Sequence, residues 1–392
     1  MKFIKNRMLS SLLFVCSLLL SYTSFADLSF QPIPPSLDAK AYILVDYHTG
    51  QILVNHNADT PIDPASLTKM ITIYVVDNEL AKGNLHLDDL VTISENAWRA
   101  EGSRMFVEVG SKISVRDLIQ GVVIQSGNDA SLALAEHVAG SEEGFVALMN
   151  HYAQAIGMKN THFVNTTGLP HENHTTTVND LSILATRIIS DFPETYKWYS
   201  EKWYTYKDIK QPNRNRLLWL DPDVDGIKTG HSSTAGFCLA ASSKKNDMRL
   251  IAILAGADND NARTTQTQQL LNFGFRFYET HHLFDGLKSI KSRRVWMSNN
   301  QKLELGLSQD LYITIPRGQY DKLDANVVIQ KQLVAPITKG KPYGKLTVKL
   351  GDTLITENTL VALSSVEKGS LFSRFSDYIS LALQKVFKSE ES

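Results

Sequence analysis

The chain has 392 residues, of which 43% are hydrophobic and 21% are charged, a composition typical of a folded globular protein and not of a disordered or fibrous one. Its 40 Lys and Arg nearly balance its 41 Asp and Glu, so no net basic field is available to hold a nucleic acid. Two cysteines are too few for a disulfide framework, a zinc site or a metal cluster, and we expect neither a metal nor another cofactor.

The N-terminal segment is typical of a secretory signal. Three basic residues precede an apolar run over residues 12–20, and the small residues Ser24 and Ala26 follow it. A transmembrane anchor is the alternative, but about 20 apolar residues are needed to span a bilayer and this run is shorter. We therefore expect a signal peptide over residues 1–26, cleaved after Ala26, and a mature chain outside the cytoplasm.

The next part of the chain predicts one mixed domain. Residues 39–51 read as a strand entering a turn, and residues 52–54 read as its return. Helical spacing then dominates from about residue 66 to residue 191. Strand signals return at residues 236–242 and 250–254, before a closing helix. Strands on both sides of a helical middle indicate an α+β domain over residues 27–280, with an antiparallel sheet and a cluster of helices.

A second, smaller domain follows over residues 281–366, and its short strand-like runs predict an all-β fold. Lys345–Leu350 alternates polar and apolar residues, and Gly351 and Asp352 supply a turn into the next strand. This part contains no cluster of His, Asp and Glu that would indicate chemistry.

Residues 367–392 predict an amphipathic helix. Its apolar positions recur at steps of three and four: Leu371, Phe375, Tyr378, Ile379, Ala382, Val386 and Phe387. The segment is too short and too charged to span a bilayer but is suited to lying in the interface of one, and we expect it to bind the membrane surface. The alternative is a helix docked on the β domain.

Ser66 and Lys69 stand three residues apart at the predicted start of a helix, just after Pro64. Positions i and i+3 share one face of a helix, so the Lys69 amine is expected beside the Ser66 hydroxyl. A serine is a weak nucleophile until a base takes its proton, and lysine can be that base only when burial or a nearby cation lowers its pKa. The pair predicts a nucleophile and its base, although a Ser-x-x-Lys pattern alone also occurs in ordinary amphipathic helices.

Two distant segments strengthen this interpretation. Ser126–Asn128 and Lys228–Gly230 follow Ser66–Lys69 in the order of the Ser-x-x-Lys, Ser-x-Asn and Lys-Thr-Gly motifs of penicillin-binding proteins and class A β-lactamases. Longer stretches around the motifs and elsewhere in the chain carry a resemblance to one known family: Pro64–Lys69, Gln125–Ala130, Asn213–Asn215, Val224–His231 and Thr314–Gly318. On these residues the chain resembles the D-alanyl-D-alanine carboxypeptidases of the penicillin-binding protein 5 type, over nearly the whole mature length. Gly127 stands where other members of the wider group have Asp.

The resemblance implies a β-lactamase/transpeptidase-like domain and a serine peptidase that removes the terminal D-Ala from the peptidoglycan pentapeptide and is acylated by β-lactams. It implies a periplasmic enzyme attached peripherally to the outer face of the inner membrane. Ser66 would be the nucleophile, Lys69 the base and Ser126 a proton relay to the leaving amine.

The substrate would be bound by the other motif residues. Asn128 would bond the substrate amide or orient Lys69. Lys228 would lower the pKa of Lys69 and attract the substrate carboxylate. The resemblance also places substrate along Thr229, Gly230 and His231, with the His231 and Ser66 backbone N–H groups as the oxyanion hole, and Arg263 near the carboxylate.

Several alternatives remain beside this hypothesis. Class A β-lactamases deacylate with a Glu-x-x-x-Asn loop, but here Glu172 is followed by Thr176, so slow release of penicillin is expected. A D,D-endopeptidase, a weak β-lactamase and a non-catalytic cell-wall scaffold are the other readings. His171 and His174 have a metal-like spacing, but without a clear third ligand they are expected to be surface histidines.

Overall fold

The computed structural model describes residues 32–299 and 301–388, with side chains to residue 383. The chain divides into a short unit over residues 1–33 and a large unit over residues 34–392. The signal peptide expected at residues 1–26 therefore lies outside the described residues. The helices and strands of the described residues all belong to the large unit.

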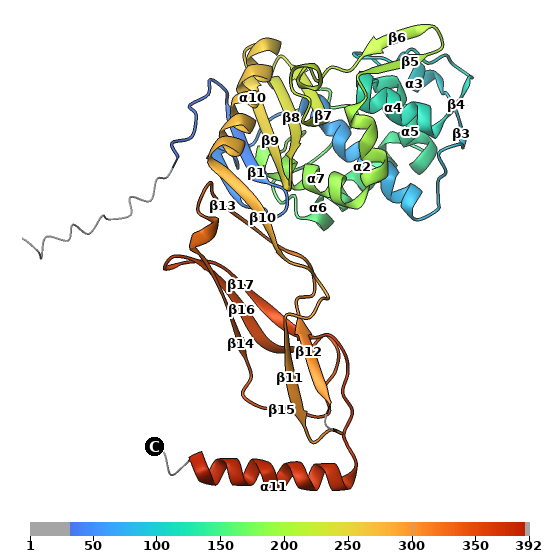
Figure 1. Ribbon diagram of the computed structural model, residues 1–392. Coiled ribbons are helices and arrows are strands. Elements are labelled where there is room, and N and C mark those ends of the chain that lie inside the picture. The colour runs from blue at the N-terminus through green and yellow to red at the C-terminus, as the bar shows by residue number, and fades with distance from the viewer. Residues whose placement is uncertain (1–31, 300, 389–392) are drawn as a thin grey trace, which may run out of the picture. The chain divides into compact units, whose positions relative to one another are not determined.

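A five-stranded antiparallel sheet is the centre of the first domain (Figure 1). Its strands are β1 (Ala41–Asp46), β2 (Ile52–His56), β7 (Val224–Ser232), β8 (Gly236–Lys245) and β9 (Met248–Ala257), in the order β2-β1-β9-β8-β7. β7 is thus the last strand at one edge. The sheet combines both ends of the domain sequence, as the strand signals predict.

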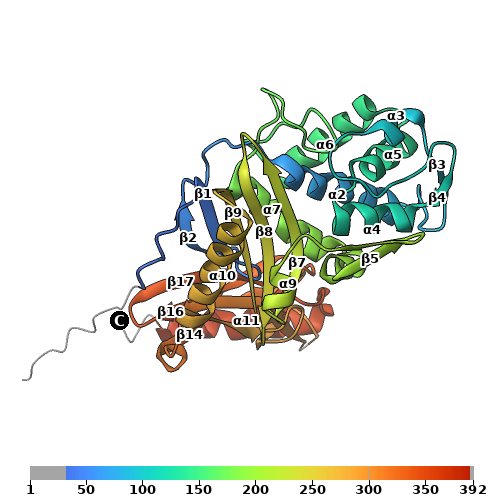
Figure 2. The same cartoon turned by 90° about the horizontal axis from the view of Figure 1, so that it is seen from above.

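Apolar residues of β9 alternate between two cores, because successive side chains of a strand point to opposite faces. Ile251 and Ile253 belong to the core that includes α2 (Lys69–Ala81), and Leu250 and Ala252 belong to the core that includes α10 (Asp260–Phe277). Figure 2 shows α10 over β8 and β9, away from the helical cluster. The sheet therefore packs against a core on each face, and β1 and β9 consist mainly of buried apolar residues.

The remaining elements of this domain connect the first two strands to the last three. The helical turns and helices are η1 (Ala65–Thr68), α3 (Glu95–Arg99), α4 (Val115–Gln125), α5 (Asn128–Ala139), α6 (Glu142–Ile156), α7 (Val178–Asp191), α8 (Pro193–Tyr196), η2 (Lys197–Ser200) and α9 (Leu217–Leu220). Two small hairpins accompany them: β3 (Leu90–Thr92) with β4 (Lys112–Ser114), and β5 (Trp203–Tyr206) with β6 (Ile209–Pro212).

The second domain is all-β, as its sequence predicts. β10 (Tyr278–Phe284) pairs with β13 (Leu311–Pro316). A six-stranded sheet has the order β14-β16-β17-β12-β11-β15. Its strands are β11 (Lys291–Trp296), β12 (Lys302–Gly306), β14 (Leu323–Ile329), β15 (Leu333–Val334), β16 (Pro342–Leu350) and β17 (Thr353–Ala362). A short 3-10 turn, η3 (Tyr320–Lys322), precedes β14. The predicted hairpin is confirmed, because Leu350 pairs with Thr353 across Gly351 and Asp352.

The last element is α11 (Leu371–Lys388), the expected C-terminal helix. Its polar side contacts the β domain: Asp377 is buried, pairs with Arg294 at 2.5 Å and accepts the backbone N–H of Met297 at 2.7 Å. Its large apolar residues are exposed, with Phe372 and Phe375 at 84% and 66%. No helix within the described residues is long and apolar enough to cross a membrane.

Candidate active site

Ser66 and Lys69 meet where η1 passes into α2. The Lys69 Nζ lies 3.2 Å from the Ser66 Oγ and donates a second hydrogen bond, of 2.5 Å, to the carbonyl of Thr167. The expected neighbourhood of hydroxyl and amine is therefore present, although Ser66 lies in a 3-10 turn and Lys69 begins the α-helix. When the amine is neutral, it can still donate to Thr167 and direct its lone pair at the Ser66 hydroxyl.

Burial lowers the pKa of Lys69 from 10.5 to about 7. The positive charge of Arg214 lowers it further, and Asp129 opposes the shift. A large neutral fraction at neutral pH suits the amine to the role of a base. Lys228 was the expected source of the nearby positive charge, but Lys228 is itself buried and its own pKa lies well below the usual value. Burial is the main cause for both amines, and the more exposed Arg214 is the fixed charge nearby.

Ser126 occupies the turn between α4 and α5 in the left-handed region, at φ +63°. Its Oγ is buried and has no hydrogen-bond partner among the described residues. An unpartnered buried hydroxyl costs about 1–3 kcal/mol, and because Ser126 lines the cleft, its hydroxyl is available to bond a ligand there. Gly127 is required beside it, since a Cβ there would lie 2.9 Å from Asp129 Oδ1 and 3.2 Å from the Met105 nitrogen.

Asn128 is less open to the cleft than the sequence implied. Its amide Nδ2 donates to the carbonyl of Glu101 at 2.5 Å, while its Oδ1 is buried without a partner among the described residues. Ser126 lines the cleft that contains Ser66, and Asn128 lines a neighbouring hollow with Thr167. Within the described part of the chain, no hydrogen bond joins Asn128 to Lys69, so the implied role of Asn128 in orienting Lys69 has no such contact to support it.

Strand β7 forms the opposite wall. Thr229, Gly230 and His231 line the cleft with Ser66, and Lys228 is buried beside them, its Nζ 3.2 Å from the carbonyl of Thr229. A Cβ at Gly230 would lie only 3.3 Å from the Ser66 nitrogen, so glycine lets the strand approach the nucleophile closely. Because β7 is an edge strand, an extended peptide can add along it.

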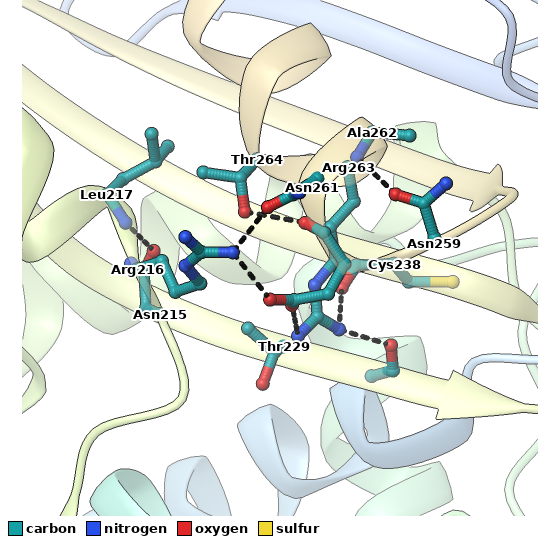
Figure 3. A network of polar contacts seen from close by, with 12 residues as sticks. Asn215, Arg216, Leu217, Thr229, Cys238, Asn259, Asn261, Ala262, Arg263 and Thr264 are labelled. Carbon is teal, nitrogen blue, oxygen red and sulfur yellow. Dashed lines mark hydrogen bonds and ion pairs between the residues drawn. The ribbon is translucent and has the colours of Figure 1, made fainter.

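Arg263 projects from α10 over β7 (Figure 3). Its Nη1 donates to the carbonyl of Gly230 at 3.0 Å, and its Nη2 lies 2.5 Å from Asp260. Asp260 also pairs with Arg216 at 3.3 Å. Both arginines line the cleft, which has a volume of about 680 Å³. Arg263 thus stands at the site, as the resemblance implies, and is held by a chain of contacts that the sequence did not indicate.

Arg214 is a cleft residue that sequence reasoning missed. Its Nε donates to the carbonyl of Gln125 at 3.0 Å, and its terminal amines have no hydrogen-bond partner among the described residues. The flanking asparagines are buried and hold the loop, with Asn215 bonded to the Gly226 carbonyl. An arginine between two buried asparagines was the available signal, because such anchors leave only the middle side chain to project.

The segment over residues 162–176 lies behind Ser66 and Lys69. It supplies the Thr167 carbonyl, and His174 contacts Thr68 there, with its Nε2 2.7 Å from the threonine Oγ1. The interpretation of His174 as a surface histidine is wrong, because its side chain is 2% exposed. His171 and Glu172 are exposed, and Glu172 is not among the residues that line the Ser66 cleft.

Comparisons with known proteins agree with this geometry. Residues 29–259 match the model of the D-alanyl-D-alanine carboxypeptidase family, and residues 278–368 match the C-terminal domain of penicillin-binding protein 5. The D-alanyl-D-alanine carboxypeptidase DacC of Escherichia coli is 41% identical over 363 residues, or 91% of each chain.

Solved structures give the same result. Penicillin-binding protein 5 of Haemophilus influenzae is similar with a TM-score of 0.82 and 41% identity, over 86% of this chain and all of that one. Penicillin-binding protein D2 of Listeria monocytogenes in the ampicillin-bound form has a TM-score of 0.58 and 28% identity, over 62% of this chain and all of that one.

Proposed function

The chain belongs to the D-alanyl-D-alanine carboxypeptidases of the penicillin-binding protein 5/6 type, serine enzymes, and we propose that it catalyses D-Ala release through an acyl-enzyme on Ser66. The observation that carries the assignment of residues is the 3.2 Å approach of the Lys69 Nζ to the Ser66 Oγ, beside the unpartnered hydroxyl of Ser126. The peptidoglycan pentapeptide is the proposed substrate.

Acylation starts when neutral Lys69 takes the Ser66 proton and the Oγ attacks the carbonyl of the penultimate D-Ala. The backbone N–H groups of Ser66 and His231 are the proposed donors to the oxyanion. The C–N bond then breaks, and the leaving amine of D-Ala takes a proton relayed from Lys69 through Ser126. Water, deprotonated by Lys69, finally attacks the ester; the bond to the Ser66 Oγ breaks, and Lys69 returns the proton to that oxygen.

The terminal carboxylate of the substrate is directed toward the cationic end of the cleft. Arg263 is fixed on the Gly230 carbonyl, and Arg214 presents free terminal amines that match a carboxylate. The Thr229 hydroxyl adds a neutral donor. Burial lowers the pKa of Lys228 well below its usual value, and we propose that these arginines contribute to the attraction that the resemblance assigned to Lys228.

β-Lactams are proposed to acylate Ser66, in line with the ampicillin-bound form of the Listeria relative. In the part of the chain that the structure describes, Glu172 does not line the cleft with Ser66, so the acyl-enzyme formed with a β-lactam is expected to hydrolyse slowly. A D,D-endopeptidase would use the same catalytic residues, but its leaving group would be larger than a single D-Ala.

The decisive experiment measures D-Ala release from diacetyl-L-Lys-D-Ala-D-Ala. The mature chain is expected to release D-Ala, and Ser66→Ala to release none while unfolding at the same temperature. Release by the Ser66→Ala variant would overturn the assignment of the nucleophile.

For location, we propose export by the segment over residues 1–26 and attachment of α11 to the outer face of the inner membrane. The catalytic domain would extend over residues 27–280, the β domain over 281–366 and the anchor over 367–392. In support, Asp377 turns the polar side of α11 toward the β domain while Phe372 and Phe375 stay exposed. An apolar helix face of this kind can enter the interface of a bilayer.

Sedimentation with vesicles of phosphatidylethanolamine and phosphatidylglycerol tests the anchor. Truncation after Lys368, or Phe372→Ser with Phe375→Ser, is expected to leave the protein in the supernatant with D-Ala release intact. Leu287→Ser, at a residue that is 67% exposed elsewhere, is the control and should still sediment. Continued sedimentation of the truncated form would reject α11 as the anchor.

A further inference from the structure

The base of the reaction is held by a backbone carbonyl from a loop. Thr167 is far from Lys69 in the sequence, and its carbonyl accepts the amine at 2.5 Å. The loop is joined to the segment before η1 by paired hydrogen bonds between Ile62 and Thr176. The direction of the Lys69 amine therefore depends on how this loop sits against η1.

His174 connects the two segments. The backbone N–H of Val164 donates to His174 Nδ1 at 3.0 Å, so Nδ1 carries no hydrogen. In a neutral imidazole the hydrogen must then be on Nε2, which donates to the Thr68 Oγ1 at 2.7 Å. One ring supplies the one acceptor and the one donor that the two segments need.

The contact acts next to the reacting pair. Thr68 lies between Ser66 and Lys69 in the chain, as the last residue of η1. The loop approaches it so closely that a Cβ at Gly168 would lie 2.9 Å from Thr68 Oγ1 and 1.8 Å from the Ala65 carbonyl oxygen. A shift of the loop at this contact would also shift the Thr167 carbonyl relative to Lys69, because Thr167 and Gly168 are neighbours in the chain and the contact is closely packed.

We propose that His174 is a positioning residue for proton transfer: by bridging Thr68 to the backbone of Val164 it fixes the Thr167 carbonyl on the Lys69 amine and so aims that amine at Ser66. The inference rests on the proposed roles of Ser66 and Lys69. His174 does not line the Ser66 cleft and is assigned no contact with substrate.

The electrostatics support a fixed neutral ring. Burial lowers the pKa of His174 to about 4, against the opposing effect of Asp63, and His162, His171 and Lys69 lower it further. The ring therefore keeps its bonding pattern at neutral pH. The charged groups that act on Lys69 are Arg214 and Asp129, and Lys228 is a second buried amine beside it. None of these changes when His174 is replaced.

The test compares His174→Phe, which keeps a ring, and Thr68→Val, which keeps the shape of the side chain. Each is expected to lower kcat for D-Ala release at least tenfold with KM within twofold. Each should also move the acid limb of kcat/KM to higher pH, because water then reaches Lys69 and raises its pKa. The double variant should be no slower than His174→Phe, since both changes remove the same bond.

Two controls separate positioning from general stability. Thr68→Ser keeps the hydroxyl and, unlike Thr68→Val, should have the kcat of the unmodified enzyme. His171→Gln changes an exposed histidine of the same loop and should also have the kcat of the unmodified enzyme. An unchanged kcat and acid limb in Thr68→Val would overturn the proposal, as would a loss of kcat that merely follows a fall in Tm. If His174→Phe does not fold, Thr68→Val alone decides. Absence of D-Ala release by the unmodified chain would instead reject the proposed function.

Discussion

The Lys69 Nζ lies 3.2 Å from the Ser66 Oγ, although the two residues belong to different helical segments. The 3-10 turn that carries Ser66 brings it against β7, and the α-helix that starts at Lys69 buries the amine in the domain core. Ser66 and Lys69 are therefore three residues apart in the sequence but differ in their surroundings: Ser66 is open to the cleft, and Lys69 is buried.

The pH profile should report the lowered pKa of Lys69. Only the neutral amine takes a proton, so kcat/KM for D-Ala release should fall below pH 7, by about fivefold between pH 7 and pH 6, and level off near pH 8. The measurement is kcat/KM from pH 5 to pH 9 at constant ionic strength. A profile flat down to pH 5 would mean that another group is the base.

Burial of the Lys69 amine should lower the free energy of unfolding, and replacing Lys69 should show by how much. Since the folded pKa of about 7 is below the unfolded value of 10.5, the unfolded chain binds more protons between these pH values, and stability rises with pH across this window. Relative to the unmodified chain, Lys69→Met should gain most at pH 7 or below, and the gain should shrink by about 1.4 kcal/mol per pH unit above it. Urea unfolding at pH 7, 8.5 and 10 measures this, with exposed Lys341→Met as the control. A difference independent of pH would contradict the buried neutral amine.

Gly168→Ala should damage both stability and activity. Its φ of +83° disfavours a side chain, and the added Cβ would lie 1.8 Å from the Ala65 carbonyl oxygen, so the loop must shift away from Lys69. Gly140→Ala is the matched control, with φ +76° and nothing within 4 Å of the added Cβ, and should lose about 1 kcal/mol with normal kcat. Thermal unfolding and D-Ala release separate the two variants. Equal losses of stability and activity in Gly168→Ala and Gly140→Ala would show that backbone strain, and not the close approach to Ala65, causes the damage.

The two arginines that share Asp260 should differ in importance. The Arg263 side chain is 9% exposed and bonded to the Gly230 carbonyl, whereas that of Arg216 is 51% exposed and screened by water. Arg263→Gln should raise KM for the D-Ala-D-Ala peptide at least tenfold, and Arg216→Gln less than threefold, with kcat nearly unchanged in the latter. The reverse order in steady-state kinetics would place the substrate carboxylate at the outer arginine.

Local patterns made much of the fold predictable. Period-two alternation marked the hairpin of β16 and β17, and the helical spacing of the C-terminal segment marked α11. The i, i+3 spacing of Ser66 and Lys69 predicted that the hydroxyl and the amine lie side by side, as the structure shows.

The remainder of the site depends on long-range contacts without a sequence pattern. The Thr167 carbonyl could belong to any residue, and His174 is buried only because residues 162–176 fold back onto η1. Arg214 lowers the pKa of Lys69, and its place beside the amine follows from long-range contacts that a linear pattern does not report. Sequence reasoning found the Ser66–Lys69 pair and missed the groups that position it.

Intact-protein mass spectrometry after exposure to benzylpenicillin, followed by peptide mapping, tests the central claim most directly. The account predicts one stable adduct per chain, on the peptide that contains Ser66, and no adduct in Ser66→Ala. An adduct on another residue, or a folded chain that stays unmodified, would contradict it.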